Sequence, residues 1–226
     1  MKRYRNVKRR SYDASHRRQQ AEETRERILD GARRLFAGRG YAETTIESIA
    51  TEAQVAVPTV YAAFQSKRGV LSALLGRLAS GEQGAPPLLE TSRARAVLAE
   101  TDPRRMLELF VDHLSQVQER VIPMYDVMKS AARSEPDVAE LLASTQAGRL
   151  SNVGAVPARL AELGALRPGL SLDDASRTVW VLASPEARQM LETFAGWSPD
   201  RFRAWLLESL CAVLLRPAVN EGARPR

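Results

Sequence analysis

The chain has 226 residues, of which 44% are hydrophobic and 27% charged, and it carries a net charge of +6. This composition is that of a soluble globular protein rather than a fibrous or disordered one, and the length allows one or two domains. The longest apolar runs, such as residues 210–215, are far shorter than the roughly 20 residues of a membrane span. Because no apolar segment follows the basic N-terminus as a secretion signal requires, we expect a cytoplasmic protein with no membrane partner.

The positive charge gathers at the N-terminus. Residues 1–20 contain eight Lys and Arg against Asp13 alone, a net of +7, so the remaining 206 residues sum to −1. Such an arm can neutralise DNA phosphates, or it can be a flexible solubilising tail, because blocks of like charge are usually disordered. Both interpretations stay open. The candidate DNA contacts of this arm are Arg9, Arg10, Arg17 and Arg18.

Three helices are predicted between residues 24 and 65. Apolar residues from Ile28 to Phe36 recur at helical spacing, and Gly40 stands where a C-terminal cap belongs. A second helix follows, for which Thr44 and Glu47 predict a capping box.

The helical period breaks after Ala53 and restarts around Pro58, a residue favoured early in a helix because its missing N–H needs no partner there. Two short helices joined by about three residues predict a helix-turn-helix, whose second helix reads DNA. Ser66 then predicts the cap of a fourth helix, which ends at Gly81.

Longer helices are predicted in the second half of the chain. Asp102 and Pro103 predict the start of one that Pro123 interrupts, and Pro136 opens another that Pro157 kinks or splits. Three more helices are predicted, at 172–183, at 185–195 and from Ser198 onward. No period-2 strand of useful length is present.

The expected fold is therefore all-α, with an N-terminal three-helix helix-turn-helix head and a C-terminal helical domain. The expected segments are a disordered basic arm 1–22, the head 23–68, a connecting helix 69–80, a linker 81–101, the helical domain 102–218 and a flexible tail 219–226.

The third helix divides into two faces when its residues are placed at 100° intervals. Val60 and Phe64 anchor it, while Thr59 can bond a base edge or phosphate and Tyr61 can reach a phosphate. No Arg, Gln or Asn stands on the outer face, so DNA shape or the arm must contribute to specificity. The candidate DNA contacts of the head are Thr44, Thr45, Pro58, Thr59, Tyr61, Ala62 and Lys67; for any one residue alone, helix capping or a solvated charge is the alternative.

Two further sets of candidates lie in the second half of the chain. Those for an apolar effector site are Phe110, His113, Met124, Tyr125, Met128 and Trp180. Those for an isologous dimer interface are Leu191, Phe194, Trp197, Phe202, Trp205, Leu206 and Leu210. Packing within the core of one chain is the alternative for both sets.

Nothing in the sequence indicates an enzyme. There is no Gly-rich phosphate loop, no metal cluster and no nucleophile paired with a base. We therefore expect no catalysis and no cofactor.

The run from Arg27 to Leu75 resembles the DNA-binding head of the tetracycline-repressor (TetR) family of bacterial transcriptional regulators. The resemblance rests on residues at the family's spacing: Phe36, Gly40, Thr44-Thr45, Ile49-Ala50, Thr59-Val60-Tyr61, Phe64 and Ser66-Lys67. It implies a homodimer whose heads enter successive major grooves of a palindromic operator. It also implies that residues 102–218 are a C-terminal helical effector-binding and dimerisation domain, in which a small-molecule effector binds and causes release of DNA. It also implies that Thr44, Thr45, Thr59, Tyr61 and Lys67 are DNA contacts.

The sequence departs from the family pattern at three places. Gln54 stands in the turn where Gly is usual, Ala56 stands where a capping Ser is common, and Ala62-Ala63 replaces a pair that often contains an aromatic residue. The expected function is a ligand-responsive homodimeric repressor. The alternatives are an effector-independent regulator or activator, and a non-specific DNA-coating protein that uses the basic arm.

Overall fold

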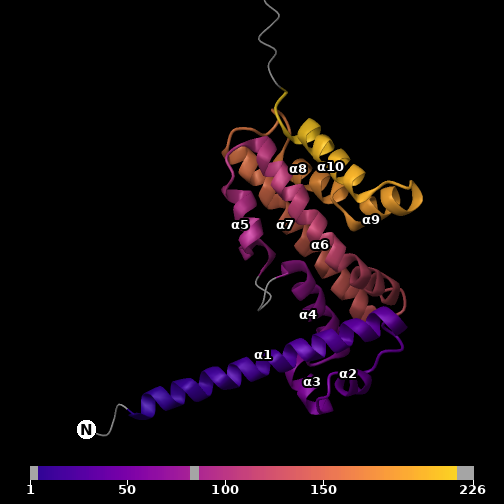
Figure 1. The fold of residues 1–226 in the computed structure, drawn as a ribbon. Helices are drawn as coiled ribbons and strands as arrows, with labels where there is room; N and C mark the ends of the chain where they lie inside the picture. The colour runs from indigo at the N-terminus through magenta and orange to yellow at the C-terminus, as the bar shows by residue number, and fades with distance from the viewer. Residues whose placement is uncertain (1–4, 82–86, 218–226) are drawn as a thin grey trace, which may run out of the picture. The chain divides into compact units, whose positions relative to one another are not determined.

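The structure, a computed structural model, describes residues 5–81 and 87–217, without the side chains of residues 5–15 and Arg17. Within these residues the fold is all-α, as predicted, and an isolated antiparallel bridge joins Leu166 to Leu215. The elements are α1 (Arg5–Arg39), α2 (Ile46–Glu52), α3 (Val57–Phe64), α4 (Lys67–Ser80), the 3₁₀ turn η1 (Leu88–Glu90), α5 (Ser92–Ala99), α6 (Pro103–Ala131), α7 (Pro136–Glu162), α8 (Leu172–Leu182), α9 (Pro185–Gln189), the π-helical turn η2 (Met190–Phe194) and α10 (Pro199–Leu214) (Figure 1).

The chain divides into two compact units. The first comprises residues 1–85 and 123–142, and the second comprises residues 86–122 and 143–226. This division differs from the expected one, because the long helices α6 and α7 each contribute to both units, and because residues 86–101 belong to the second unit instead of forming a linker. Val97 of α5 is 4% exposed and lies in the core of that unit, which explains why α5 packs as part of it.

In the first unit, α1 packs on α2 and α4, and α3 packs on both α2 and α4. The helix boundaries follow local chemistry, as predicted. Gly40 has φ +76° after α1, Gly81 has φ +65° after α4, and the Ser66 hydroxyl accepts a hydrogen bond from Gly69 N at 3.0 Å at the start of α4.

Ion pairs tie α1 to its neighbours. Arg77 of α4 reaches Glu26 and Asp30 of α1 at 2.6 and 2.9 Å, and Arg34 of α1 reaches Glu52 of α2 at 2.7 Å. The part of α1 before residue 22, which we expected to be disordered, continues the helix and extends past α2 and α3 (Figure 1). Its Arg, Lys, Gln and Ala residues are good helix formers.

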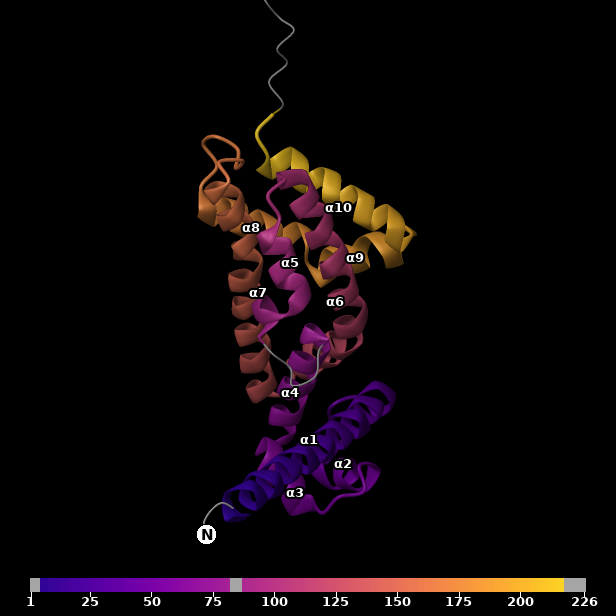
Figure 2. The same ribbon diagram turned by 60° about the vertical axis from the view of Figure 1, so that its left-hand side comes forward.

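The second unit is built around one apolar core to which α5, α6, α7, α8 and α10 all contribute. Figure 2 shows α5 alongside α6 and α7, with α10 crossing at the end of the unit where α8 also lies. None of the described helices is both long and apolar enough to span a bilayer.

Pro123 does not interrupt its helix, contrary to prediction, because α6 continues to Ala131. Pro157 does not split its helix either, since α7 continues to Glu162. Each helix buries residues close to its proline, such as Met124 beside Pro123 and Val156 beside Pro157. This packing outweighs the hydrogen bond that a proline removes inside a helix.

Candidate DNA-binding surface and ligand cavity

The helix-turn-helix is formed by α2, α3 and the turn between them. Gln54 adopts φ +55° immediately after the C-cap of α2, which turns the chain sharply enough for α3 to begin at Val57. Val55 N donates to Ala50 O at 2.9 Å and closes the turn. As predicted, Ala56 supplies no side-chain cap to α3.

The face of α3 that points away from the core is small and sparsely polar. Val60 and Phe64 are 0% and 6% exposed and anchor the helix. Pro58, Ala62 and Ala63 are exposed, Thr59 is half-buried, and the side chain of Tyr61 is 47% exposed. Hydroxyl groups of Thr59 and Tyr61 can bond bases or phosphates, while the alanine methyls offer apolar contact alone.

Thr44 and Thr45 have different environments at the start of α2. Thr45 is exposed and is the N-cap, with Oγ1 accepting from Ser48 N at 3.1 Å and Ser48 Oγ accepting from Thr45 N at 3.0 Å. The predicted capping box is therefore shifted by one residue. Thr44 is 0% exposed and donates from Oγ1 to Gly40 O at 2.7 Å. A side chain buried in this way cannot reach DNA, which corrects the predicted contact.

Contacts from α1 and α4 stabilise the helix-turn-helix, of which α3 is the second helix. Arg25 of α1 donates to the carbonyl of Ala63 at 3.1 Å, and its guanidinium lies 4.3 Å from the centre of the Phe64 ring. Lys67, a candidate phosphate contact, is half-buried at the first position of α4, where Tyr41 holds its ammonium.

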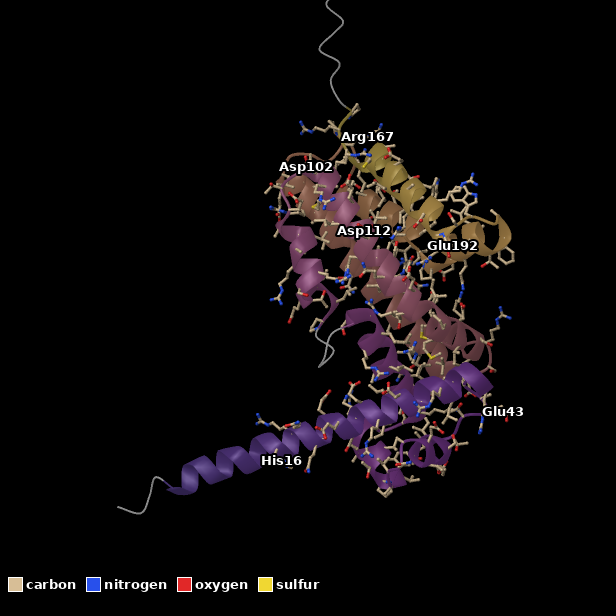
Figure 3. The ribbon with its side chains drawn as sticks, viewed as in Figure 1. His16, Glu43, Asp102, Asp112, Arg167 and Glu192 are labelled. Atoms are coloured by element: carbon tan, nitrogen blue, oxygen red, sulfur yellow. The ribbon has the colours of Figure 1, made fainter. Side chains whose placement is uncertain are left out.

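The basic residues of the N-terminal segment are described only in part. Arg18 is exposed on α1. Arg9, Arg10 and Arg17 belong to the helix, but their side chains lie outside the described part of the structure. Figure 3 shows His16 on the stretch of α1 that extends beyond α2 and α3.

A cavity of about 120 Å³ lies within the second unit. One wall is a stripe of α6 at helical spacing, a second is a stripe of α7, and η1 with α5 and the segment after α8 close it. Its lining residues are Leu88, Leu89, Ala94, Val97, Leu98, Phe110, His113, Leu114, Val117, Gln118, Val121, Arg149, Asn152, Val153, Ala155, Val156, Ala183 and Pro185. Among the described residues, no cluster of His, Cys, Asp and Glu could hold a metal ion.

The structure places two of the six predicted effector residues, Phe110 and His113, in the lining of this cavity. Met124, Tyr125 and Met128 do not line it, because they are buried in the first unit. Trp180 packs against the core of the second unit, and its carbonyl accepts from Arg149 Nη1 at 2.8 Å.

Three of the residues predicted at a dimer interface belong to the core of a single chain. Phe202, Leu206 and Leu210 are 0% exposed within the second unit, so they cannot add surface to a contact between two chains. This corrects that part of the prediction. Phe194 is 85% exposed, whereas Leu191, Trp197 and Trp205 are half-buried.

Sequence reasoning missed most of the lining residues, including Val117, Gln118 and Val121 of α6, the leucines of η1 and all the lining residues of α5 and α7. The α6 residues continue the stripe of Phe110 and Leu114 at steps of three and four, a signal that the sequence does contain. The leucines carry no comparable signal, because their segment has no long helical period.

These features define a helix-turn-helix protein with a separate helical unit that contains a cavity. Residues 28–74 match the family model described as bacterial regulatory proteins, tetR family. Over 57 residues the chain is 40% identical to the uncharacterized HTH-type transcriptional regulator YvkB of Bacillus subtilis (strain 168), a match that spans 25% of this chain and 30% of that protein. The likeness to the tetR family thus lies in the DNA-binding head, residues 28–74.

Two solved structures show the same fold beyond the head. The crystal structure of NalD, the secondary repressor of the MexAB-OprM multidrug efflux pump in Pseudomonas aeruginosa, has a TM-score of 0.64 at 24% identity and covers 86% of this chain and 98% of its own. A complex of SmeT with triclosan has a TM-score of 0.66 at 23% identity and covers 90% and 98%. At this level of sequence identity, the two structures show a shared fold and nothing beyond it.

Proposed function

We propose that the protein is a homodimeric transcriptional repressor that binds a palindromic operator and releases it when a small molecule enters the cavity. The observation that carries the proposal is the helix-turn-helix itself: α3 is anchored by Val60 and Phe64 and presents Thr59 and Tyr61 outward, beside the exposed N-cap Thr45 of α2. Such a unit docks α3 in the major groove while the N-terminus of α2 meets phosphates. Acting on chromosomal DNA, the protein is cytoplasmic.

Response to a ligand is supported by the cavity of the second unit. Effector sites are concave and mostly apolar with few polar groups, as this lining is. The fold is shared with a repressor of an efflux pump and with a protein solved in complex with triclosan. Release of DNA requires that the ligand bind one of two conformations more tightly, with a coupling of about 1–3 kcal/mol.

Dimerisation is supported by apolar side chains that one chain leaves exposed. Leu172 and Val181 of α8 are 49% and 55% exposed, and Met190 and Phe194 of η2 are 64% and 85% exposed. We place the isologous interface on these residues together with the outer surface of α10. Equilibrium sedimentation tests this directly, and a stable monomer at micromolar concentration would contradict it.

The test of the DNA function is a selection of bound fragments from the source genome, beginning with the region upstream of the gene itself. We expect a small set of fragments that share a palindrome, each bound far more tightly than random DNA. Replacing Tyr61 by Phe should lower affinity for the selected fragment about fivefold, since one hydrogen bond contributes roughly 1 kcal/mol. Equal affinity for random and selected DNA would instead indicate a non-specific coating protein.

A further inference from the structure

We propose that the cavity of the second unit takes small, neutral, apolar molecules of the size of one hydrocarbon ring, and that it binds them without a hydrogen bond. This inference rests on the proposed ligand response and specifies the class of ligand. Three features of the cavity carry it: its size, the carbon surface of its wall, and the burial of the polar atoms that its lining residues contain.

The cavity is small for a ligand site. Its volume is about 120 Å³, whereas sites for drug-sized ligands occupy about 300–1,000 Å³. An engineered apolar cavity of about 150 Å³ binds benzene. The space therefore suits one hydrocarbon ring or a short aliphatic chain, and a larger ligand requires that the surrounding helices move.

The wall of the cavity is made of carbon. Most of its lining residues are Leu, Val, Ala, Phe and Pro, and the lining exposes almost no nitrogen or oxygen to the cavity. Such a surface makes dispersion contacts with a ligand and removes the ligand's apolar surface from water. Each carbon atom that fits therefore adds affinity, whereas a polar atom finds no partner.

The polar lining residues contribute almost none of the surface that a ligand would touch. Gln118 is 3% exposed, its Nε2 donates to the carbonyl oxygen of Ala183 at 3.0 Å, and its Oε1 is buried. Both ring nitrogens of His113 are buried as well. Asn152 is half-buried, and it too lines the cavity with carbon, because the wall has so little polar surface. An atom that a water molecule cannot touch is also out of reach of a ligand hydroxyl.

Arg149 is the one Lys, Arg, Asp or Glu among the described lining residues, and protein groups engage its guanidinium. Nη1 donates to Trp180 O at 2.8 Å, Nε donates to Gln146 Oε1 at 3.2 Å, and the guanidinium lies 4.8 Å from the centre of the Trp180 ring. No Asp or Glu of the described residues lines the cavity to balance a cation. Charge at the wall therefore favours neither an anionic nor a cationic ligand.

Polar ligands lose affinity in a cavity of this kind. A hydroxyl group that enters gives up its hydrogen bonds to water and gains none from the wall, and an unpaired buried charge is more unfavourable still. The cavity therefore discriminates against hydroxyl and charged groups by their desolvation, and among apolar molecules it discriminates by size.

Toluene, phenol and benzoate are matched probes, since they carry a methyl, a hydroxyl and a carboxylate group on the same ring. Binding of each to the full-length protein, without DNA, is measured by isothermal titration calorimetry. We expect toluene to bind about tenfold or more tightly than phenol, because the phenol hydroxyl loses its water partners. Benzoate should show no binding at the same concentrations, because its charge would be buried.

A pair of variants shows whether toluene binds in this cavity. Val117 of α6 lines it, so Val117→Phe should fill the space and lower toluene affinity about tenfold or more. Val127→Phe is the matched control, because Val127 is half-buried on the same helix but does not line the cavity, and toluene affinity should be kept. Urea unfolding checks that both variants fold. On the wild type, NMR contacts between toluene and the methyl groups of Val117 and Val153 give a readout that needs no variant.

Three results would overturn the inference: absence of toluene binding to the wild type, binding of phenol or benzoate as tightly as toluene, or unchanged toluene affinity in a folded Val117→Phe variant. All of these are measured without DNA, so they are separate from the fragment selection that tests the proposed function. If toluene binds as expected but leaves operator affinity unchanged, the inference about the cavity stands and the ligand-responsive part of the proposed function fails.

Discussion

Lys67 Nζ donates a hydrogen bond to the backbone carbonyl of Tyr41 at 2.9 Å and lies 4.1 Å from the centre of the Tyr41 ring. The contact joins the first residue of α4 to the loop before α2, and it gives Lys67 a structural role beside its expected contact with a phosphate. In the protein without DNA, Tyr41 thus holds the Lys67 ammonium in one position instead of leaving it to move freely in solvent.

Replacing Lys67 by Met should therefore lower both stability and DNA affinity. The lost charged hydrogen bond and cation–π contact predict a loss of about 1–2 kcal/mol in the free energy of unfolding, measured with urea. Tyr41→Phe is the matched control, because it keeps both the carbonyl and the ring. A Lys67→Met variant of unchanged stability that binds DNA weakly would assign this lysine to the phosphate alone.

Gln54 should be a site where glycine stabilises the head. Its φ of +55° is in the left-handed region, which costs a residue with a Cβ roughly 1–2 kcal/mol, partly offset by the greater chain entropy of glycine. We expect Gln54→Gly to raise the free energy of unfolding by up to about 1 kcal/mol. Gln54→Ala keeps the strain and should give no gain, so equal stability of the two variants would argue against backbone strain.

Gly69 should tolerate no side chain. A Cβ on this residue would collide with the backbone carbonyl of Phe64, at the point where α3 ends and α4 begins. Gly69→Ala should destabilise the head by more than about 2 kcal/mol or displace α3, with loss of operator binding in a mobility-shift assay. Gly76→Ala on the same helix meets nothing within 4 Å, and it should stabilise the protein by about 0.5–1 kcal/mol.

The basic N-terminal segment should be visible in the salt dependence of binding. Each phosphate that it neutralises adds about 0.9 to the slope of log affinity against log salt. Deleting residues 1–18 should weaken operator binding and flatten that slope. A variant with Gln at Arg9, Arg10, Arg17 and Arg18 keeps helix propensity and removes only charge, so it should behave likewise. If neither change alters the slope, the segment serves solubility.

The Tyr41 hydroxyl should lose its proton at a higher pH than a tyrosine side chain in water. Burial, with smaller contributions from the carboxylates of Asp137 and Glu135, raises its pKa to about 12. Since the folded pKa exceeds the unfolded value of about 10, the head keeps this contribution to stability below pH 10 and loses it as the pH rises towards 12. The difference in phenolate absorbance between wild type and Tyr41→Phe measures it. A difference that titrates near pH 10 would contradict the prediction.

Much of the head could be predicted from the sequence because its signals are local. Gly40 and Gly81 end helices by adopting positive φ, and Ser66 and Ser198 begin helices by accepting from a backbone N–H three residues later. These contacts act within one turn, so sequence spacing is enough to find them. The all-α fold and the anchoring of α3 through Val60 and Phe64 follow from the same periodicity.

The sequence by itself thus determined where most helices begin and end and which face of α3 is apolar. Tertiary packing alone decided which of the adjacent Thr44 and Thr45 is buried, and that Phe202 lies in the core of one chain instead of at an interface. It also decided the orientation of the Gln118 amide, since its Nε2 donates to the carbonyl of Ala183, 65 residues further along the chain. The physical reason is that burial and amide orientation depend on partners that only the folded chain brings together.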